Sequence, residues 1–437
     1  MSHSGPFGPG SSDDDPFGAL NFFLRDIGQM FSSGANDPWE TATQLAGSIA
    51  NEGRPDPNVE PVDRMAVEQL ARVAELQVVD ITGLTTDGPV RVDAMNRTQW
   101  ARQFLHDYRP LIGQITGSVE AALRAQMGPL SEDPEESPFP GGAASQMIEQ
   151  LMGMMGPIML GMMAGTSAGH IASRALGHYE LPVPRPTDTP LTVVLTNVDE
   201  FAREWSLPDD TVRLWVCVSD VAHHQVLGIP HVRSQLNGLL EAYAGAFSTD
   251  PEEIESRIRS LGIDDMLSGS EPEFEAMQQL AGDPELLLGA MQSDRQRALM
   301  AQIDTLVATI EGYVDFVLDT VGERLLPDYA RVTEALRRRR VEAGPASRFV
   351  ERLFGLELSQ STFDRGANFV RGIVVRGGAD AAARLWDDPE HLPTSAELDA
   401  PGLWLARVGL ASIDLDLPED LDIPDFPDFG DAPDSDA

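Results

Sequence analysis

The hydrophobic positions of the chain recur at helical spacing over most of its length. One stretch, 211–231 (TVRLWVCVSDVAHHQVLGIPH), is apolar on nearly every side, which predicts a buried helix. Asp209 and Asp210 precede it, and either is expected to accept hydrogen bonds from the free N–H groups of the first turn. Gly228, followed by Pro230, predicts where this helix ends.

The same periodicity predicts helices on both sides of this stretch. They are expected at 20–32, 39–51, 63–79, from Asn96 onwards, and at 232–247, 294–326, 348–356, 362–376, 380–386 and 396–410. The helix over 63–79 is expected to bury a face made of Met65, Val67, Leu70, Val73 and Leu76. One short strand is expected at 191–195, and 80–92 is a turn-rich connection that could hold another. The predicted fold class is therefore mainly α, with at most a small sheet.

Changes in composition divide the chain into five regions. Residues 1–19 are rich in Gly, Ser, Pro and Asp, and 412–437 hold ten acids and no base, so both ends are predicted to be disordered tails. The acidic-apolar alternation of the second tail could also bind a groove on a partner. Between the tails we expect an N-terminal helical region at 20–130, an acidic loop at 131–145 and a larger helical domain at 146–411.

Residues 151–169 carry no charge over a length that could span a bilayer. Gly and Pro are frequent there, Glu149 stands just before the segment, and no basic residue flanks its start. A buried helix or helical hairpin is therefore expected, and a membrane span is not.

The charge excludes several classes of function. The net charge is −39, from 70 acidic and 31 basic residues, and every basic residue is Arg. Such acidity disfavours binding to nucleic acid or anionic membranes, and the lack of Lys excludes Schiff-base chemistry and a Walker-type phosphate loop. The basic run Arg337–Arg340 is expected to end a helix and to pair with acids. A single cysteine, Cys217, and no signal peptide predict a cytoplasmic protein.

Polar residues inside the central helix form a candidate site. Ser219, Asp220 and His223 fall in the frame of the zinc-binding H-E-x-x-H helix, in which two His hold the metal and the Glu activates its water. Asp220 stands at the Glu position and His223 at the second His, but Ser219 replaces the first His. The alternative is a structural Asp–His pair that ties neighbouring helices together.

A second polar pair lies in another apolar stretch, 302–319 (QIDTLVATIEGYVDFVLD). Glu311 and Asp315 are four residues apart and share one helix face. In thermolysin-like zinc peptidases an E-x-x-x-D element supplies the third metal ligand from its Glu, and its Asp orients the first His. The alternative is an ordinary ion pair with an Arg, because a charged pair inside an apolar helix needs a cation or donor opposite it.

These motifs resemble the zincin-like metallopeptidase family of actinobacteria, whose members are often described as hydrolases. The resemblance covers nearly the whole chain. It rests on PFG at 6–8 and 16–18, the Met/Gly-rich segment near 150, RLWVCVSDVAHHQVLGIPHVRSQL, IEGYVDFVLD, the arginine run, FGLEL at 354–358 and LWDDPEHLPTSAELD at 385–399. It implies a zincin-like helical domain over 146–411, metal ligation by His223 and Glu311, a catalytic role for Asp220, and Asp315 and Ser219 beside the ligands.

The departure at Ser219 separates three functional hypotheses. A catalytic zinc needs three protein ligands and a water, and this chain offers two. The first hypothesis is a zincin-fold pseudoenzyme with a decayed metal site that binds or scaffolds a protein or peptide partner. The second is an active zinc-dependent hydrolase or peptidase with a substitute ligand, for which His224 and His231 are the candidates. The third is a purely structural helical protein.

Overall fold

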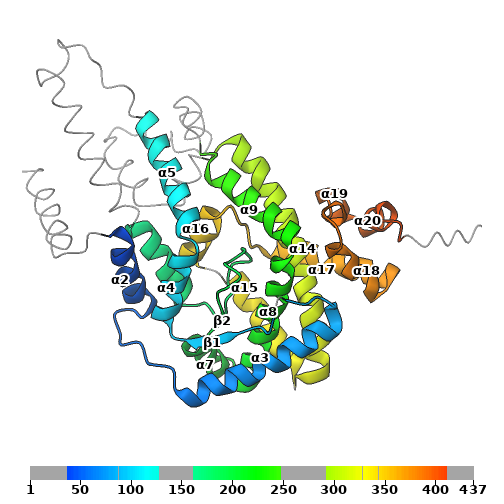
Figure 1. Ribbon diagram of the computed structural model, residues 1–437, viewed down its shortest axis with the longest axis horizontal. Coiled ribbons are helices and arrows are strands. Elements are labelled where there is room, and N and C mark those ends of the chain that lie inside the picture. Colours follow the sequence, from blue (N-terminus) through cyan, green and yellow to red (C-terminus); the bar gives the residue numbers. More distant parts are fainter. Residues whose placement is uncertain are drawn as a thin grey trace, which may run out of the picture.

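The computed structural model describes residues 37–86, 88–126, 161–247, 292–326, 328–342 and 344–410 (Figure 1). The predictions for residues 1–32, for the acidic loop at 131–145, for 151–160 and for the tail at 412–437 lie outside these residues. The described part of the chain is mainly helical around a small sheet, as the periodicity predicted.

The described helices are α2 Pro38–Ala50, α3 Pro61–Thr82, α4 Arg97–Asp107, α5 Arg109–Gln126, α7 Leu195–Glu204, α8 Asp209–Gly228, α9 Pro230–Ala244, α14 Asp294–Leu325, α15 Tyr329–Val341, α16 Pro345–Leu353, α17 Gln360–Gly377, α18 Ala379–Ala383, α19 Ser395–Asp399 and α20 Pro401–Arg407. Most of them lie in the predicted ranges, but α7 and most of α15 were not predicted, and the helices expected from Asn96 and at 396–410 are each divided in two. Short 3₁₀ helices at Arg384–Trp386 and Pro389–His391 connect α18 to α19. Residues 161–172 are also helical.

The sheet consists of two short parallel strands. Strand β1 (Val92–Met95) pairs with β2 (Leu191–Val194), with Val92 opposite Leu191 and Met95 opposite Val194. Every residue of β2 is buried, whereas β1 alternates between buried and more exposed positions. The strand expected at 191–195 is thus confirmed, and its partner lies at the end of the turn-rich connection.

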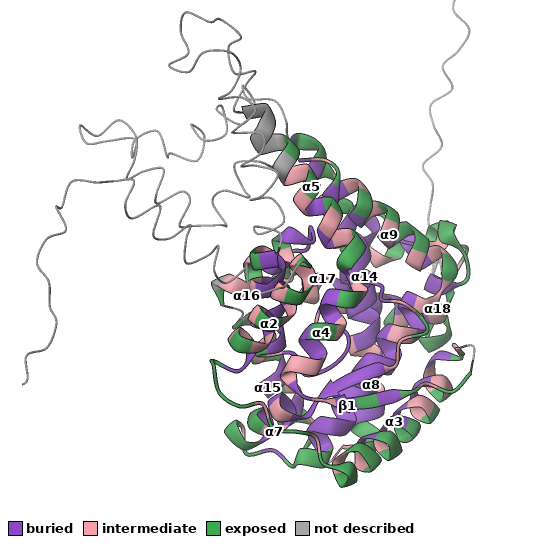
Figure 2. Ribbon diagram, turned by 60° about the vertical axis from the view of Figure 1, so that its left-hand side comes forward, coloured by how far each residue is buried: buried purple, intermediate pink, exposed green. Residues whose placement is uncertain are grey.

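Helix α8 runs through the centre of the molecule and is buried along almost its whole length (Figure 2). It packs against α3, α7, α9, α14 and β2. Because neighbours surround it, apolar residues are needed on nearly every side, which is the pattern that the sequence shows. The polar residues of its middle turns are therefore placed inside the protein.

The predicted start of α8 is wrong in one detail. Pro208 occupies the N-cap position and offers no side-chain cap, and Asp209 and Asp210 lie in the first turn of the helix. Their carboxylates still face the positive end of the helix dipole, which is a favourable place for negative charge. The helix ends at Gly228 as predicted, and Pro230 begins α9, where its missing N–H has no helical partner to lose.

Helix α3 buries a different face from the one predicted. Val67 is buried and Leu70 is half-buried against the core, as expected, but Met65, Val73 and Leu76 are exposed. The other buried residues of the helix are Ala71, Ala74, Val78 and Thr82. Small side chains on the inner face allow α3 to lie directly against α8, which carries the larger residues. Residue size at the contact, and not hydrophobicity alone, decided which face turned inward.

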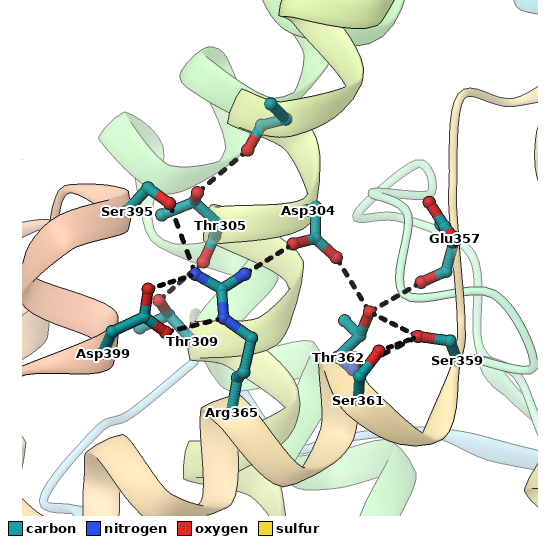
Figure 3. Close-up of polar contacts among 11 residues, drawn as sticks. Asp304, Thr305, Thr309, Glu357, Ser359, Ser361, Thr362, Arg365, Ser395 and Asp399 are labelled. Atoms are coloured by element: carbon teal, nitrogen blue, oxygen red, sulfur yellow. Dashed lines mark hydrogen bonds and ion pairs between the residues drawn. The ribbon is translucent and has the colours of Figure 1, made fainter.

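Helices α14 and α17 pack with their backbones in contact. A Cβ added at Gly312 would clash with the backbone of Gly366, and one added at Gly366 would clash with the carbonyl of Ala308. A polar cluster centred on Arg365 of α17 closes this contact at one end (Figure 3). Arg365 Nη1 donates to Asp304 of α14 at 3.0 Å, and its Nε donates to Asp399 of α19 at 2.8 Å.

Within the described residues, no helix combines the length and the apolar character that crossing a membrane requires.

Candidate functional site

The two predicted motif helices meet, and the meeting point joins their polar residues. His223 of α8 lies beside Glu311 of α14, with 3.1 Å between His223 Nε2 and Glu311 Oε1. The two side chains are only 3 % and 6 % exposed. An acidic group this deeply buried is stable only with a hydrogen-bonded or charged partner, and the imidazole is that partner.

Both nitrogens of the His223 ring face hydrogen-bond acceptors. Nδ1 lies 2.9 Å from the backbone carbonyl oxygen of Ser219, one helical turn earlier. A carbonyl oxygen can only accept, so Nδ1 carries a proton, and Nε2 must carry another to donate to the Glu311 carboxylate. His223 is therefore best described as an imidazolium paired with a carboxylate.

Electrostatics favour this charged pair. Burial alone would lower the pKa of His223, but the neighbouring Glu311 and the hydrogen bonds raise it above its usual 6.5. Burial alone would raise the pKa of Glu311, but His223 and the nearby Arg340 hold it below its usual value. The two shifts have opposite signs, as expected for a buried ion pair.

Arg340, at the end of α15, adds a second cation. Its Nη1 donates to Asp315 Oδ1 at 2.9 Å, and its Nη2 lies 3.9 Å from Glu311 Oε2. The guanidinium packs against the rings of Trp215 and Phe363, at 5.9 and 4.9 Å from their centroids. The arginine therefore connects the two carboxylates that the sequence placed on one face of α14.

Asp220 lies beside His223 on α8 and holds a backbone segment. Its Oδ2 accepts from the N–H of His178 at 2.7 Å, and its Oδ1 accepts from the N–H of Tyr179 at 3.0 Å. Burial raises the pKa of this carboxyl to about 6, and the two N–H groups limit the rise. Gly177 lies so close that a Cβ there would clash with the Asp220 carboxylate.

Residues 175–185 form a buried connection that crosses the interior, which is uncommon for a loop because its backbone polar groups need partners. Several side chains supply such partners besides Asp220, three of them to the middle of the segment. Trp100 Nε1 donates to the carbonyl of Gly177, Tyr108 Oη donates to that of Val183, and Arg185 Nη1 donates to that of His178. Asp220 is thus one of several groups that fix this connection.

Tyr179, in the same connection, lies between the two histidines of α8. Its ring stacks on the His223 ring with centroids 5.6 Å apart and planes 20° from parallel. Its hydroxyl lies 3.1 Å from His224 Nδ1. The neighbouring histidines therefore have separate environments, as their 100° separation around the helix requires.

A cavity of about 100 Å³ opens at this site. Ser219, Asp220, His223 and Glu311 line it together with Arg340. Further charged side chains of its wall are paired with one another: Arg339 Nη2 donates to Glu180 Oε1 at 3.1 Å, and Arg174 lies near the same carboxylate. The cavity thus has polar walls whose charges are largely matched.

The predicted site residues are therefore brought together, but with unequal roles. His223 and Glu311 are in direct contact, and Asp315 joins them through Arg340. His224 lines a different cavity, near β2, and His231 borders neither. Cys217 is a buried free thiol, whose pKa is raised by burial.

The sequence did not predict that two residues, Arg340 and Tyr179, belong to the site. Arg340 was expected to pair with acids at a helix end, and Glu311 and Asp315 were expected to need a cation, but nothing in the sequence linked the two statements. Tyr179 lies in a Pro-rich segment without periodicity and gave no signal.

The comparison with protein families matches residues 38–405 to the model of the zincin-like metallopeptidases. The chain belongs to the zincin-like metallopeptidase family. It is also similar in fold to a crystal structure from Chloroflexus aurantiacus described as "a putative hydrolase with a novel fold". The two share 23 % sequence identity over 85 % of this chain and 98 % of that chain, with a TM-score of 0.55. No protein of curated function matches the sequence.

The donor groups at the site do not fit the zinc that this zincin family usually binds. In the alignment that the sequence predicts, Ser219 stands at the position of the first His ligand, and the Nε2 of His223 directs a proton toward Glu311. Metal ligands must be deprotonated and must leave room for the ion between them. Among the described residues, no group of three or more His, Cys, Asp or Glu side chains is placed to hold a metal.

Proposed function

We propose that this zincin-like protein is a pseudoenzyme that keeps the fold of a metallopeptidase, lacks a catalytic metal, and binds or scaffolds a protein or peptide partner. The observation that carries the proposal is the 3.1 Å contact between His223 Nε2 and Glu311 Oε1. The two side chains that would ligate zinc in an intact site are hydrogen-bonded to each other.

The hydrogen-bond geometry supports a structural use of the former motif. His223 connects α8 to α14, and Asp220 connects α8 to the buried segment at 175–185. An Asp whose two carboxylate oxygens each accept a backbone N–H is poorly placed to activate a water as a general base. Each motif residue thus has a partner within the fold.

The alternative of an active hydrolase needs a third ligand from elsewhere in the chain. His224 is hydrogen-bonded to Tyr179 and lines another cavity, so its ring does not supply the missing third metal ligand. This arrangement favours the pseudoenzyme over the hydrolase.

The chemistry of the surface and of the single thiol guides the choice of partner and compartment. With a net charge of −39, binding to nucleic acid is disfavoured, and a protein or peptide is the partner that we propose. A free buried cysteine is compatible with the cytoplasmic location that we expect.

The test is the metal content of protein purified without chelators or a metal-affinity tag. We expect far less than one zinc per chain, before and after incubation with zinc, and no cleavage of fluorogenic peptides. The matched control is His223→Ala, which should leave the zinc content unchanged. About one zinc per chain, lost in His223→Ala, would overturn the proposal and make the hydrolase the better reading.

A further inference from the structure

Two acidic side chains on α14 need positive charge, and His223 of the motif helix α8 supplies it only to Glu311. Glu311 and Asp315 lie one turn apart, and their side chains are only 6 % and 14 % exposed. Two carboxylates this close repel each other, and burial increases the cost of keeping them ionised. The fold must therefore provide a second cation, one that pairs with Asp315 and lies near Glu311.

In the zincin site that the family resemblance implies, zinc would neutralise the Glu, and a zinc-bound imidazole would meet the Asp. Ser219 removes that imidazole from this chain, and with it the third ligand. The positive charge that Asp315 needs must then come from another element, and the contacts of Arg340 show which one.

Arg340 reaches both carboxylates from α15. One nitrogen of its guanidinium lies 2.9 Å from Asp315 and another lies 3.9 Å from Glu311. The rings of Trp215 and Phe363 pack against the group and hold its plane in place. A guanidinium can occupy such a site because it is always charged and keeps a fixed, planar set of donors.

The other arginines of the same run behave differently. Arg337 and Arg338 are more than half exposed and pair with surface acids, Asp319 and Glu334. Arg339 pairs with Glu180 on the far wall of the cavity. The position of Arg340 at the motif is thus specific to that residue and is not a general property of a basic helix end.

We infer that Arg340 takes the electrostatic place of the metal ion, so that the site is completed by a cation from the chain itself. The inference rests on the proposed function, because it requires that no zinc is bound. It has a direct consequence: a divalent cation between His223 and Glu311 would lie within a few ångströms of the guanidinium, so zinc and Arg340 exclude each other.

The experiment restores the lost ligand with and without the arginine. Zinc affinity is measured by calorimetric titration for the full-length protein, for Ser219→His, and for the double variant Ser219→His/Arg340→Met. The matched control is Ser219→His/Arg338→Met, which removes an exposed arginine two residues away. We expect no binding by the unaltered protein, weak binding by Ser219→His, and affinity higher by roughly tenfold or more in the Arg340 double variant, with no gain in the control.

The outcomes separate the inference from the proposed function. Zinc binding by the unaltered protein overturns the proposed function. Absence of zinc there, with equal affinities of Ser219→His and its Arg340 double variant, overturns the inference alone. If the double variant is unfolded without metal, circular dichroism during zinc addition replaces calorimetry: recovery of helix supports the inference, and no recovery overturns it.

Discussion

Two arginines of this protein each join two acidic side chains, and they do so in different surroundings. Arg340 contacts Asp315 and Glu311 at the candidate site, where its own side chain is 17 % exposed. Arg365 contacts Asp304 and Asp399 at the end of the α14–α17 contact, where it is 30 % exposed and Asp399 is 60 % exposed (Figure 3). The chemistry of the pairs is the same, and the access of water differs.

The comparison shows that the contribution of an ion pair to stability depends on the surroundings of the carboxylates that lose their partner when the pair is broken. At the Arg365 cluster, water can solvate the freed carboxylates, so the pair contributes little. At Arg340, the freed carboxylates remain buried beside each other, so the loss of the cation is costly. Close helix packing holds the region around Arg365, and matched charge holds the region around Arg340.

Replacing Arg340 is expected to have the largest effect. Arg340→Met should lower the free energy of unfolding by about 3 kcal/mol, because it leaves the buried Asp315 without its cation and removes one of the two cations beside Glu311. Chemical denaturation monitored by circular dichroism measures this loss. Arg338→Met is the control and should cost less than about 0.5 kcal/mol, since its partner Glu334 is exposed. A loss below about 1 kcal/mol for Arg340→Met would place it with the surface pairs and remove the contrast.

The helix contact beside Arg365 should be more sensitive than the arginine itself. Gly366→Ala adds a methyl group where the backbone of α14 already touches, so we expect a loss of about 2 kcal/mol from the forced separation of α14 and α17. The same denaturation experiment measures it. Gly402→Ala, where a Cβ has open space, is the control and should be nearly neutral. If Gly366→Ala were also neutral, close packing would not be what holds this region.

Removing the exposed cluster's cation should have a smaller effect. Arg365→Met should cost about 0.5–1 kcal/mol in dilute buffer, because Asp399 is already largely solvated. The loss should shrink in about 1 M NaCl, where screening weakens exposed pairs, whereas that of Arg340→Met should change little. Equal salt dependence of the two variants would contradict the difference in burial on which the comparison rests.

The smallest expected effect is a difference in pH dependence. The pKa of His223 is raised above 6.5 in the folded protein. The pair with Glu311 therefore makes its full contribution to stability below pH 6.5, and this contribution is lost as pH rises through the pKa of the folded protein. The pKa of Asp399 is lowered by Arg365, so that pair is lost only as pH falls below about 3.8. Thus the stability difference between the protein and His223→Gln should decrease as pH rises above about 6.5, and that for Arg365→Met should stay constant over the same range.

Denaturation curves at several pH values provide this measurement. A constant difference for His223→Gln would mean that His223 is not an imidazolium in the folded protein, and it would favour a neutral ring with only one of its two hydrogen bonds.

The sequence by itself determined most of the helices and the motif residues that meet at the site. The apolar spacing at 211–231 and 302–319 predicted α8 and α14, and their polar residues could be placed on shared faces because helix geometry fixes which positions align. The charge of −39 disfavoured nucleic acid as a partner. The family resemblance added the zincin expectation, which the match over 38–405 confirms.

Only the tertiary structure decided what those residues do there. Periodicity is a local property, and it does not tell which cation from a distant helix reaches Glu311 and Asp315, or that Asp220 turns toward the segment at 175–185. It also placed the larger residues of α3 inward, whereas packing against α8 selected the smaller face. Partners that lie far apart in sequence are chosen by the fit and charge of the assembled fold, and these exist only once the helices are packed.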